Sequence, residues 1–135
     1  MLLLRARDGR QWRFTLDDLR RLPARRLRTA LPAALGMTGA SDWEGVPLSA
    51  LVALAGPPPQ AVSLTALNAY AVNVPGRDLA RYDPVLAYRR DGQDIAVRDK
   101  GPLILIYPFD RFPAELNTQA YINRTIWQVH EIVLE

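Results

Sequence analysis

The side chains that could carry nucleophilic or acid–base chemistry are few in this sequence. There is no cysteine, and the one histidine, His130, falls in an alternating segment near the C-terminus. The absence of cysteine excludes disulfides, thiolate zinc sites, iron–sulfur clusters and cysteine nucleophiles. A hydrolytic triad needs a base, and Ser41, Ser49 and Ser63 stand in no nucleophile-elbow pattern. A lone histidine on a strand is usually structural, so we expect neither hydrolysis nor a metal site.

Anion binding is the chemistry that the remaining polar residues favour. Arg98 and Lys100 stand beside Gly101-Pro102, and Lys100 is the only lysine in the sequence. A two-residue spacing at a strand end puts both side chains on one face, and a turn here can leave backbone N–H groups facing a ligand. A neighbouring strand that brings up neutral donors would fix the ligand's orientation. The predicted ligand-binding residues are Asn68, Tyr70, Arg98, Lys100 and Arg124.

A structural interpretation of these residues is also open. Arg98, Asp99 and Arg124 can form an ion-pair network, in which each exposed pair contributes at most about 1 kcal/mol. Tyr70, Tyr107 and Trp127 can then belong to the core. The sequence does not decide between this interpretation and an anion site.

The charge distribution raises an alternative function. Residues 1–28 hold nine arginines against three acidic residues, whereas the rest of the chain is mildly acidic, and the net charge is +3. Trp12 and Phe14 lie among these arginines, so the segment could contact phosphates and stack on bases, or bind a membrane surface. No nucleic-acid motif accompanies the charge, and the chain uses arginine almost everywhere in place of lysine. We therefore expect a solvated face there and no nucleic-acid partner.

The secondary structure follows from turn residues and hydrophobic periodicity. Asp8-Gly9 and Asp91-Gly92 are hairpin turns, Thr15 with Asp18 is a capping-box-like helix start, and Pro47 suits the first turn of a helix. The expected strands are 2–6, 11–14, 25–29, 62–66, 71–74, 85–89, 93–97, 103–107 (a central strand) and 126–134. The expected helical segments are 15–22, 47–55 and 77–82, with a loop at 30–42 and irregular structure at 109–118.

Many short strands with a few short helices, not in strict alternation, predict an α+β fold. We expect a curled mixed sheet on which the helix 48–55 packs through Leu48, Leu51 and Val52. The 49% hydrophobic and 23% charged residues predict a packed core, and 135 residues fit one domain, 1–135. The sequence shows no signal peptide and no apolar run of the roughly 18 residues that a membrane span needs.

Five segments in order resemble one family. They are Trp43-Glu44-Gly45-Val46-Pro47-Leu48 followed by Leu51 and Gly56, Ala66-Leu67-Asn68-Ala69-Tyr70, Leu86-Ala87-Tyr88 before Asp91-Gly92, Lys100-Gly101-Pro102-Leu103, and Arg124-Thr125-Ile126-Trp127-Gln128. Together they cover residues 43–134 and resemble the small molybdopterin-binding oxidoreductase domain, which has the sulfite oxidase fold. The resemblance implies that fold, a molybdopterin cofactor and a periplasmic or secreted location.

The sequence departs from this family at the residues that the resemblance implies for molybdenum binding and catalysis. The resemblance implies a molybdenum-ligating cysteine in the loop before Trp43, but the only polar side chains from 29 to 41 are hydroxyls, Thr29, Thr38 and Ser41. A hydroxyl is a poor substitute for a soft thiolate. Where larger relatives have a histidine before the Gly-Pro loop and an arginine after it, this chain has Asp99, Lys100 and Ile104. We expect a family member without molybdenum redox activity that binds a small anionic ligand or a protein partner. A true oxidoreductase without a thiolate ligand is the alternative.

Overall fold

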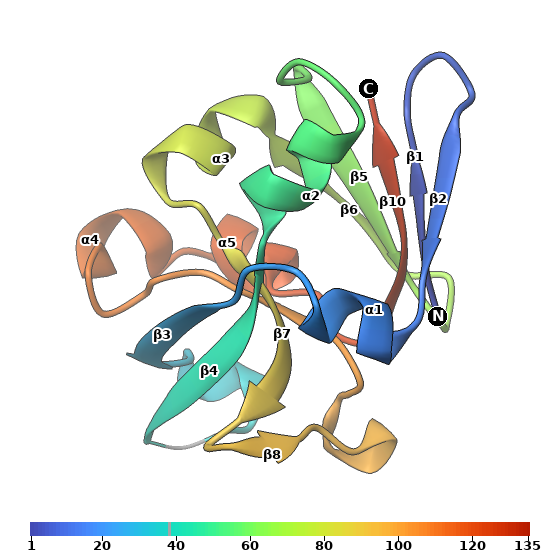
Figure 1. The fold of residues 1–135 in the computed structure, drawn as a ribbon. Coiled ribbons are helices and arrows are strands. Elements are labelled where there is room, and N and C mark those ends of the chain that lie inside the picture. The colour runs from blue at the N-terminus through green and yellow to red at the C-terminus, as the bar shows by residue number, and fades with distance from the viewer. Residues whose placement is uncertain (38) are drawn as a thin grey trace.

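The computed structural model describes residues 1–37 and 39–135. Its strands form two five-stranded sheets, which lie side by side in Figure 1. The strands are β1 Leu2–Arg5, β2 Gln11–Phe14, β3 Arg25–Ala30, β4 Ala40–Pro47, β5 Ala61–Ala66, β6 Ala71–Pro75, β7 Val85–Arg90, β8 Gln93–Asp94, β9 Ile104–Ile106 and β10 Val129–Leu134. The helices are α1 Leu16–Arg20, α2 Leu48–Leu54, α3 Gly76–Arg81, α4 Pro113–Leu116 and α5 Gln119–Arg124, with 3₁₀ turns η1 Ala33–Leu35 and η2 Val97–Asp99.

The first sheet joins the two ends of the chain. Its order is β2-β1-β10-β5-β6, and only the β1–β10 pair in it is parallel. Leu2 and Leu4 on β1 and Leu64 on β5 are fully buried, because alternate strand residues face the core. The N-terminal hairpin and the last strand are thus held together by a pairing that spans almost the whole sequence.

The second sheet carries the middle of the chain. Its order is β3-β4-β7-β8, and β9 also pairs with β7. A register shift between Glu44 and Gly45 marks a bulge in the β4–β7 pair. At this bulge the Gly45 Cα lies against the backbone of Leu86 and Ala87, which leaves no room for a Cβ atom.

Helix α2 follows β4 directly and packs as expected. Pro47 caps it, and its Leu48, Leu51 and Val52 side chains are buried. Figure 1 shows α2 and α3 above the second sheet and beside β5 and β6 of the first sheet. The predicted α+β architecture with few short helices is therefore observed, in two sheets rather than one.

Several expected elements differ from the observed ones. The loop predicted over 30–42 ends early, because β4 begins at Ala40 and pairs along its length with β3. The strand predicted over 93–97 is only Gln93–Asp94, since the chain turns into η2. The segment 109–118 contains α4, which has proline at its first position.

The prediction that 103–107 is a central strand was also wrong. Strand β9 pairs with β7 on one side. On its other side the described contacts are the Ile104–Trp127 bridge and two flanking bonds, from Leu105 N–H to the Ile126 carbonyl and from Val129 N–H to the Leu103 carbonyl. The continuous apolar run indicated burial correctly, because all three residues of β9 are buried.

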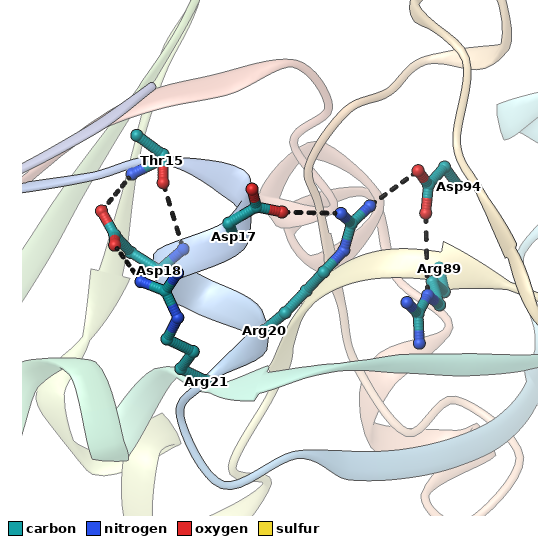
Figure 2. A network of polar contacts seen from close by, with 7 residues as sticks. All are labelled: Thr15, Asp17, Asp18, Arg20, Arg21, Arg89 and Asp94. Atoms are coloured by element: carbon teal, nitrogen blue, oxygen red, sulfur yellow. Dashed lines mark hydrogen bonds and ion pairs between the residues drawn. The ribbon is translucent and has the colours of Figure 1, made fainter.

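Helix α1 is fixed by polar contacts, which Figure 2 shows. Thr15 forms a capping box with Asp18, and its N–H holds the pKa of Asp18 below its ordinary value. Arg20 bridges Asp17 and Asp94, at 3.2 and 2.6 Å, and so connects α1 to the end of the second sheet. Asp94 also contacts Arg89 at 3.6 Å.

A buried polar cluster joins three other elements. Asp78 on α3 is fully buried and accepts hydrogen bonds from the Tyr107 hydroxyl at 2.9 Å and from the Tyr121 hydroxyl at 3.1 Å. Burial and the nearby Asp78 raise the pKa of Tyr107 above its ordinary value and that of Tyr121 to about 12. Edge-to-face ring contacts pack Tyr82 and Tyr107 against Tyr121. The cluster ties α3, the end of β9 and α5 together.

Candidate ligand-binding site

Lys100 lies in a tight turn and not at the end of a strand. Val97, Arg98 and Asp99 form the 3₁₀ turn η2, and Lys100 closes it in the left-handed conformation at φ 76°. The alternation argument that put Arg98 and Lys100 on one strand face was therefore wrong. The Lys100 N–H donates to the Val97 carbonyl at 3.1 Å and the Gly101 N–H to the Ala96 carbonyl at 2.8 Å. These two amides are thus not free for a ligand, which corrects the sequence prediction.

Arg98 and Lys100 nevertheless border one hollow. It has a volume of about 310 Å³ and is lined by Gly36, Met37, Arg90, Arg98, Asp99 and Lys100. We call it the cationic hollow, because three of its six lining residues are basic. It joins η2 to the segment just before β4, which are far apart in the sequence.

Arg90 is the best-positioned cation in the cationic hollow. Its Nε donates to the Ser41 hydroxyl at 2.9 Å, and its guanidinium lies over the Trp43 ring at 5.3 Å. Ser41 is buried and Trp43 is in the core. Arg90 was not predicted from the sequence, because its last position on β7 gives no sign that β4 and residues 36–37 lie beside it.

The predicted ion-pair network is present only in part. Arg98 contacts Asp99 at 4.0 Å, and both side chains are well exposed, at 89% and 65%. Arg124 instead donates to the Asn73 carbonyl at 3.1 Å and lies over the Tyr121 ring. Arg124 was among the predicted ligand-binding residues, but it does not border the cationic hollow.

Asn68 and Tyr70 line a second hollow. It has a volume of about 320 Å³ and is lined by Ala66, Asn68, Tyr70 and Trp127. We call it the aromatic hollow. Tyr70 is 45% exposed and therefore is not a core residue, which the structural interpretation had assumed. Lys100 lies between the two hollows, with its Nζ over the Trp127 ring at 4.7 Å.

The two described hydroxyls in the stretch before Trp43 are already hydrogen-bonded. The Thr29 hydroxyl donates to the Ala30 carbonyl and accepts from the Asp110 N–H at 3.0 Å, and the Ser41 hydroxyl accepts from Arg90. Thr38, the third hydroxyl of this stretch, lies outside the described residues. Within residues 1–37 and 39–135, no three histidine or carboxylate side chains come together as a metal site.

Most of the N-terminal arginines are paired with acids. Within the described chain, ion pairs engage seven of the nine, and Arg7 and Arg13 are in none. The charge that suggested nucleic-acid or membrane-surface binding is thus largely neutralised locally. None of the described helices is long and apolar enough to span a membrane.

Comparison with known proteins finds a matching family and a solved structure with a similar fold. Residues 4–110 match the model of a family described as the oxidoreductase molybdopterin binding domain. No match was found among curated proteins. Among solved structures, the sulfane dehydrogenase SoxCD from Paracoccus pantotrophus is similar, with a TM-score of 0.74 and 20% identity over 98% of this chain. This chain spans 37% of that SoxCD chain, and at such identity the likeness concerns the fold.

Proposed function

Because the chain belongs to the oxidoreductase molybdopterin-binding domain family, we propose that it binds a small anion in the cationic hollow without molybdenum redox catalysis. The observation that carries the proposal is the role of Ser41. This hydroxyl, on β4 two residues before Trp43, accepts a hydrogen bond from Arg90, so it orients a cation instead of offering a ligand to a metal. A phosphate, an oxyanion or a carboxylate is the class of ligand that such cations bind.

The donor set does not fit a protein-bound molybdenum. The chain has no cysteine, and the described hydroxyls of Thr29 and Ser41 are buried and already hydrogen-bonded. Breaking either bond to free an oxygen would remove the partner of the Asp110 N–H or of the Arg90 guanidinium. We therefore derive no redox step for this site.

The cations do fit the anionic part of a ligand. Arg90 is held in place by Ser41 and Trp43, whereas Arg98 is almost fully exposed and free to reorient. Lys100 has no carboxylate within ion-pair distance among the described residues, and Asp99 is the one acid of the hollow. A ligand with one or two negative charges would balance this excess. The phosphate of a pterin monophosphate is one such group.

Elemental analysis tests the absence of molybdenum. The protein is expressed in a host that makes the molybdenum cofactor, purified and analysed for metal. We expect far less than one molybdenum per chain and no sulfite oxidation. About one molybdenum per chain would contradict the proposal, whatever the activity assays show.

Calorimetry tests the anion site. Titration with sulfate, phosphate and a pterin monophosphate should give saturable binding at millimolar concentration or tighter. Lys100→Ala and Arg98→Ala should weaken binding by about tenfold each while leaving thermal stability almost unchanged, since both residues are at the surface. Arg111→Ala is the matched control, because Arg111 is exposed and borders neither hollow. No binding to the parent protein, or equal binding to Lys100→Ala, would show that the site does not exist.

A further inference from the structure

The aromatic hollow carries a separate inference. We propose that it is a binding site for a planar aromatic ring that bears an anionic group, with the ring against Tyr70 and Trp127 and the anion toward Lys100. This site does not require that the cationic hollow bind an anion.

The two aromatic walls are held in place before any ligand binds. The Tyr70 hydroxyl donates to the Asn123 carbonyl at 3.1 Å, so the exposed ring is anchored at its far end. The Trp127 backbone is held by its bridge to Ile104, and the Lys100 ammonium lies over one face of its indole ring. Fixed aromatic side chains bind rings well, because little side-chain freedom is lost on binding.

The polar groups at the aromatic hollow are only partly used by the protein. The Asn68 side-chain oxygen accepts from the Tyr70 N–H at 3.1 Å, so its NH₂ group is left to donate. Among the described residues, Lys100 has a ring partner and no carboxylate partner. A donor and an unpaired cation beside an apolar hollow favour a ligand with a negative group on one edge.

The loops around the aromatic hollow hold unfavourable backbone conformations. Five non-glycine residues of the described chain have positive φ, and three of them belong to these loops: Ala69 at 72°, Lys100 at 76° and Gln128 at 57°. Each costs of the order of 1 kcal/mol, and such residues gather at binding sites. Hydrogen bonds between the loops maintain them, from Leu67 N–H to the Gln128 carbonyl at 2.9 Å and from Gln128 N–H to the Lys100 carbonyl at 3.2 Å.

The surroundings and the size of the aromatic hollow restrict the class of ligand that it can bind. Leu67, which lies between the lining residues Ala66 and Asn68 in the sequence, is 59% exposed, so apolar surface extends beyond the hollow. A volume of about 320 Å³ lies at the lower end of the range for ligand pockets, about 300–1,000 Å³. The ligand class is therefore an aromatic anion of one to three fused rings, either a free aromatic acid or the ring of a phosphate ester.

Titration with two probes tests the proposal on the full chain. 2-Naphthoate and flavin mononucleotide are added at up to millimolar concentration, with calorimetry and tryptophan fluorescence as readouts. We expect saturable binding of at least one, and at least tenfold weaker binding of cyclohexanecarboxylate, which has the charge without the flat ring. Tighter binding of naphthoate identifies a free aromatic acid, and tighter binding of the flavin identifies a phosphate ester.

Variants locate the site and separate it from the proposed function. Tyr70→Ala and Trp127→Ala should each weaken ring binding by about tenfold or more and leave sulfate binding unchanged, and Lys100→Met should weaken both. Because Tyr70 is exposed, Tyr70→Ala should fold and still tests ring binding even if Trp127→Ala folds poorly. If neither probe binds, or if both aromatic variants bind as the parent does, the inference is wrong. Sulfate binding without ring binding refutes this site alone, and ring binding without sulfate binding refutes the proposed function alone.

Discussion

Replacement of Asp78 by alanine should destabilise the fold strongly. Asp78 is fully buried and accepts from two phenols, Tyr107 at 2.9 Å and Tyr121 at 3.1 Å. A hydrogen bond to a carboxylate contributes about 1.5–3 kcal/mol, so the two bonds set an upper limit of about 6 kcal/mol. Tyr121 is half-buried and recovers part of its bond from water. We therefore expect Asp78→Ala to lower the free energy of unfolding by about 3–5 kcal/mol.

The measurement is equilibrium urea unfolding followed by tryptophan fluorescence. A domain of this length has about 7–20 kcal/mol of stability, so the variant should still fold at 25 °C. Asp78→Asn keeps the shape, accepts from one phenol and donates to the other, and should lose about 1–2 kcal/mol. Tyr70→Phe is the control, because it removes one neutral, exposed bond to the Asn123 carbonyl and should cost under about 1 kcal/mol. If Asp78→Ala costs no more than Tyr70→Phe, the cluster does not stabilise the fold as argued.

Three further predictions concern stability. Folding raises the pKa of Tyr121 from 10.0 to about 12 and raises that of Tyr107 as well, so the contribution of these two tyrosines to stability should be constant below about pH 10 and should fall as the pH rises above it. Tyr121→Phe should flatten this alkaline loss in urea titrations at several pH values, and an unchanged profile would be inconsistent with the assignment. Gly45→Ala should lower stability by about 2 kcal/mol or more, because the new Cβ meets the Leu86 backbone, and a melting temperature equal to the parent's would contradict this. Thr15→Ala should cost about 1 kcal/mol by removing the α1 cap, whereas Thr15→Ser, which keeps the hydroxyl, should recover most of it in the same thermal melts.

The sequence alone determined most of the local elements. Asp8-Gly9 closes the β1–β2 hairpin, and Thr15 and Asp18 form the capping box, both as predicted. Pro47, predicted at the first position of the helix, lies one residue before α2. These signals are local, because turn and cap conformations depend on a few neighbouring residues. The five family segments also predicted the fold class and the family correctly. The missing cysteine needed no structure either, because it is a matter of composition.

The tertiary structure decided which residues share a site. Arg98 and Lys100 were grouped by sequence spacing, but the 3₁₀ turn directs Lys100 onto Trp127, while Arg90 and residues 36–37 come from elsewhere to border the cationic hollow. Asn68 and Tyr70 lie in a different hollow, and Arg124 in neither. Side-chain proximity between distant segments follows from strand pairing and loop-to-loop hydrogen bonds across the fold. Periodicity within one segment carries no information about those long-range contacts, so only the folded chain could reveal two neighbouring hollows with Lys100 between them.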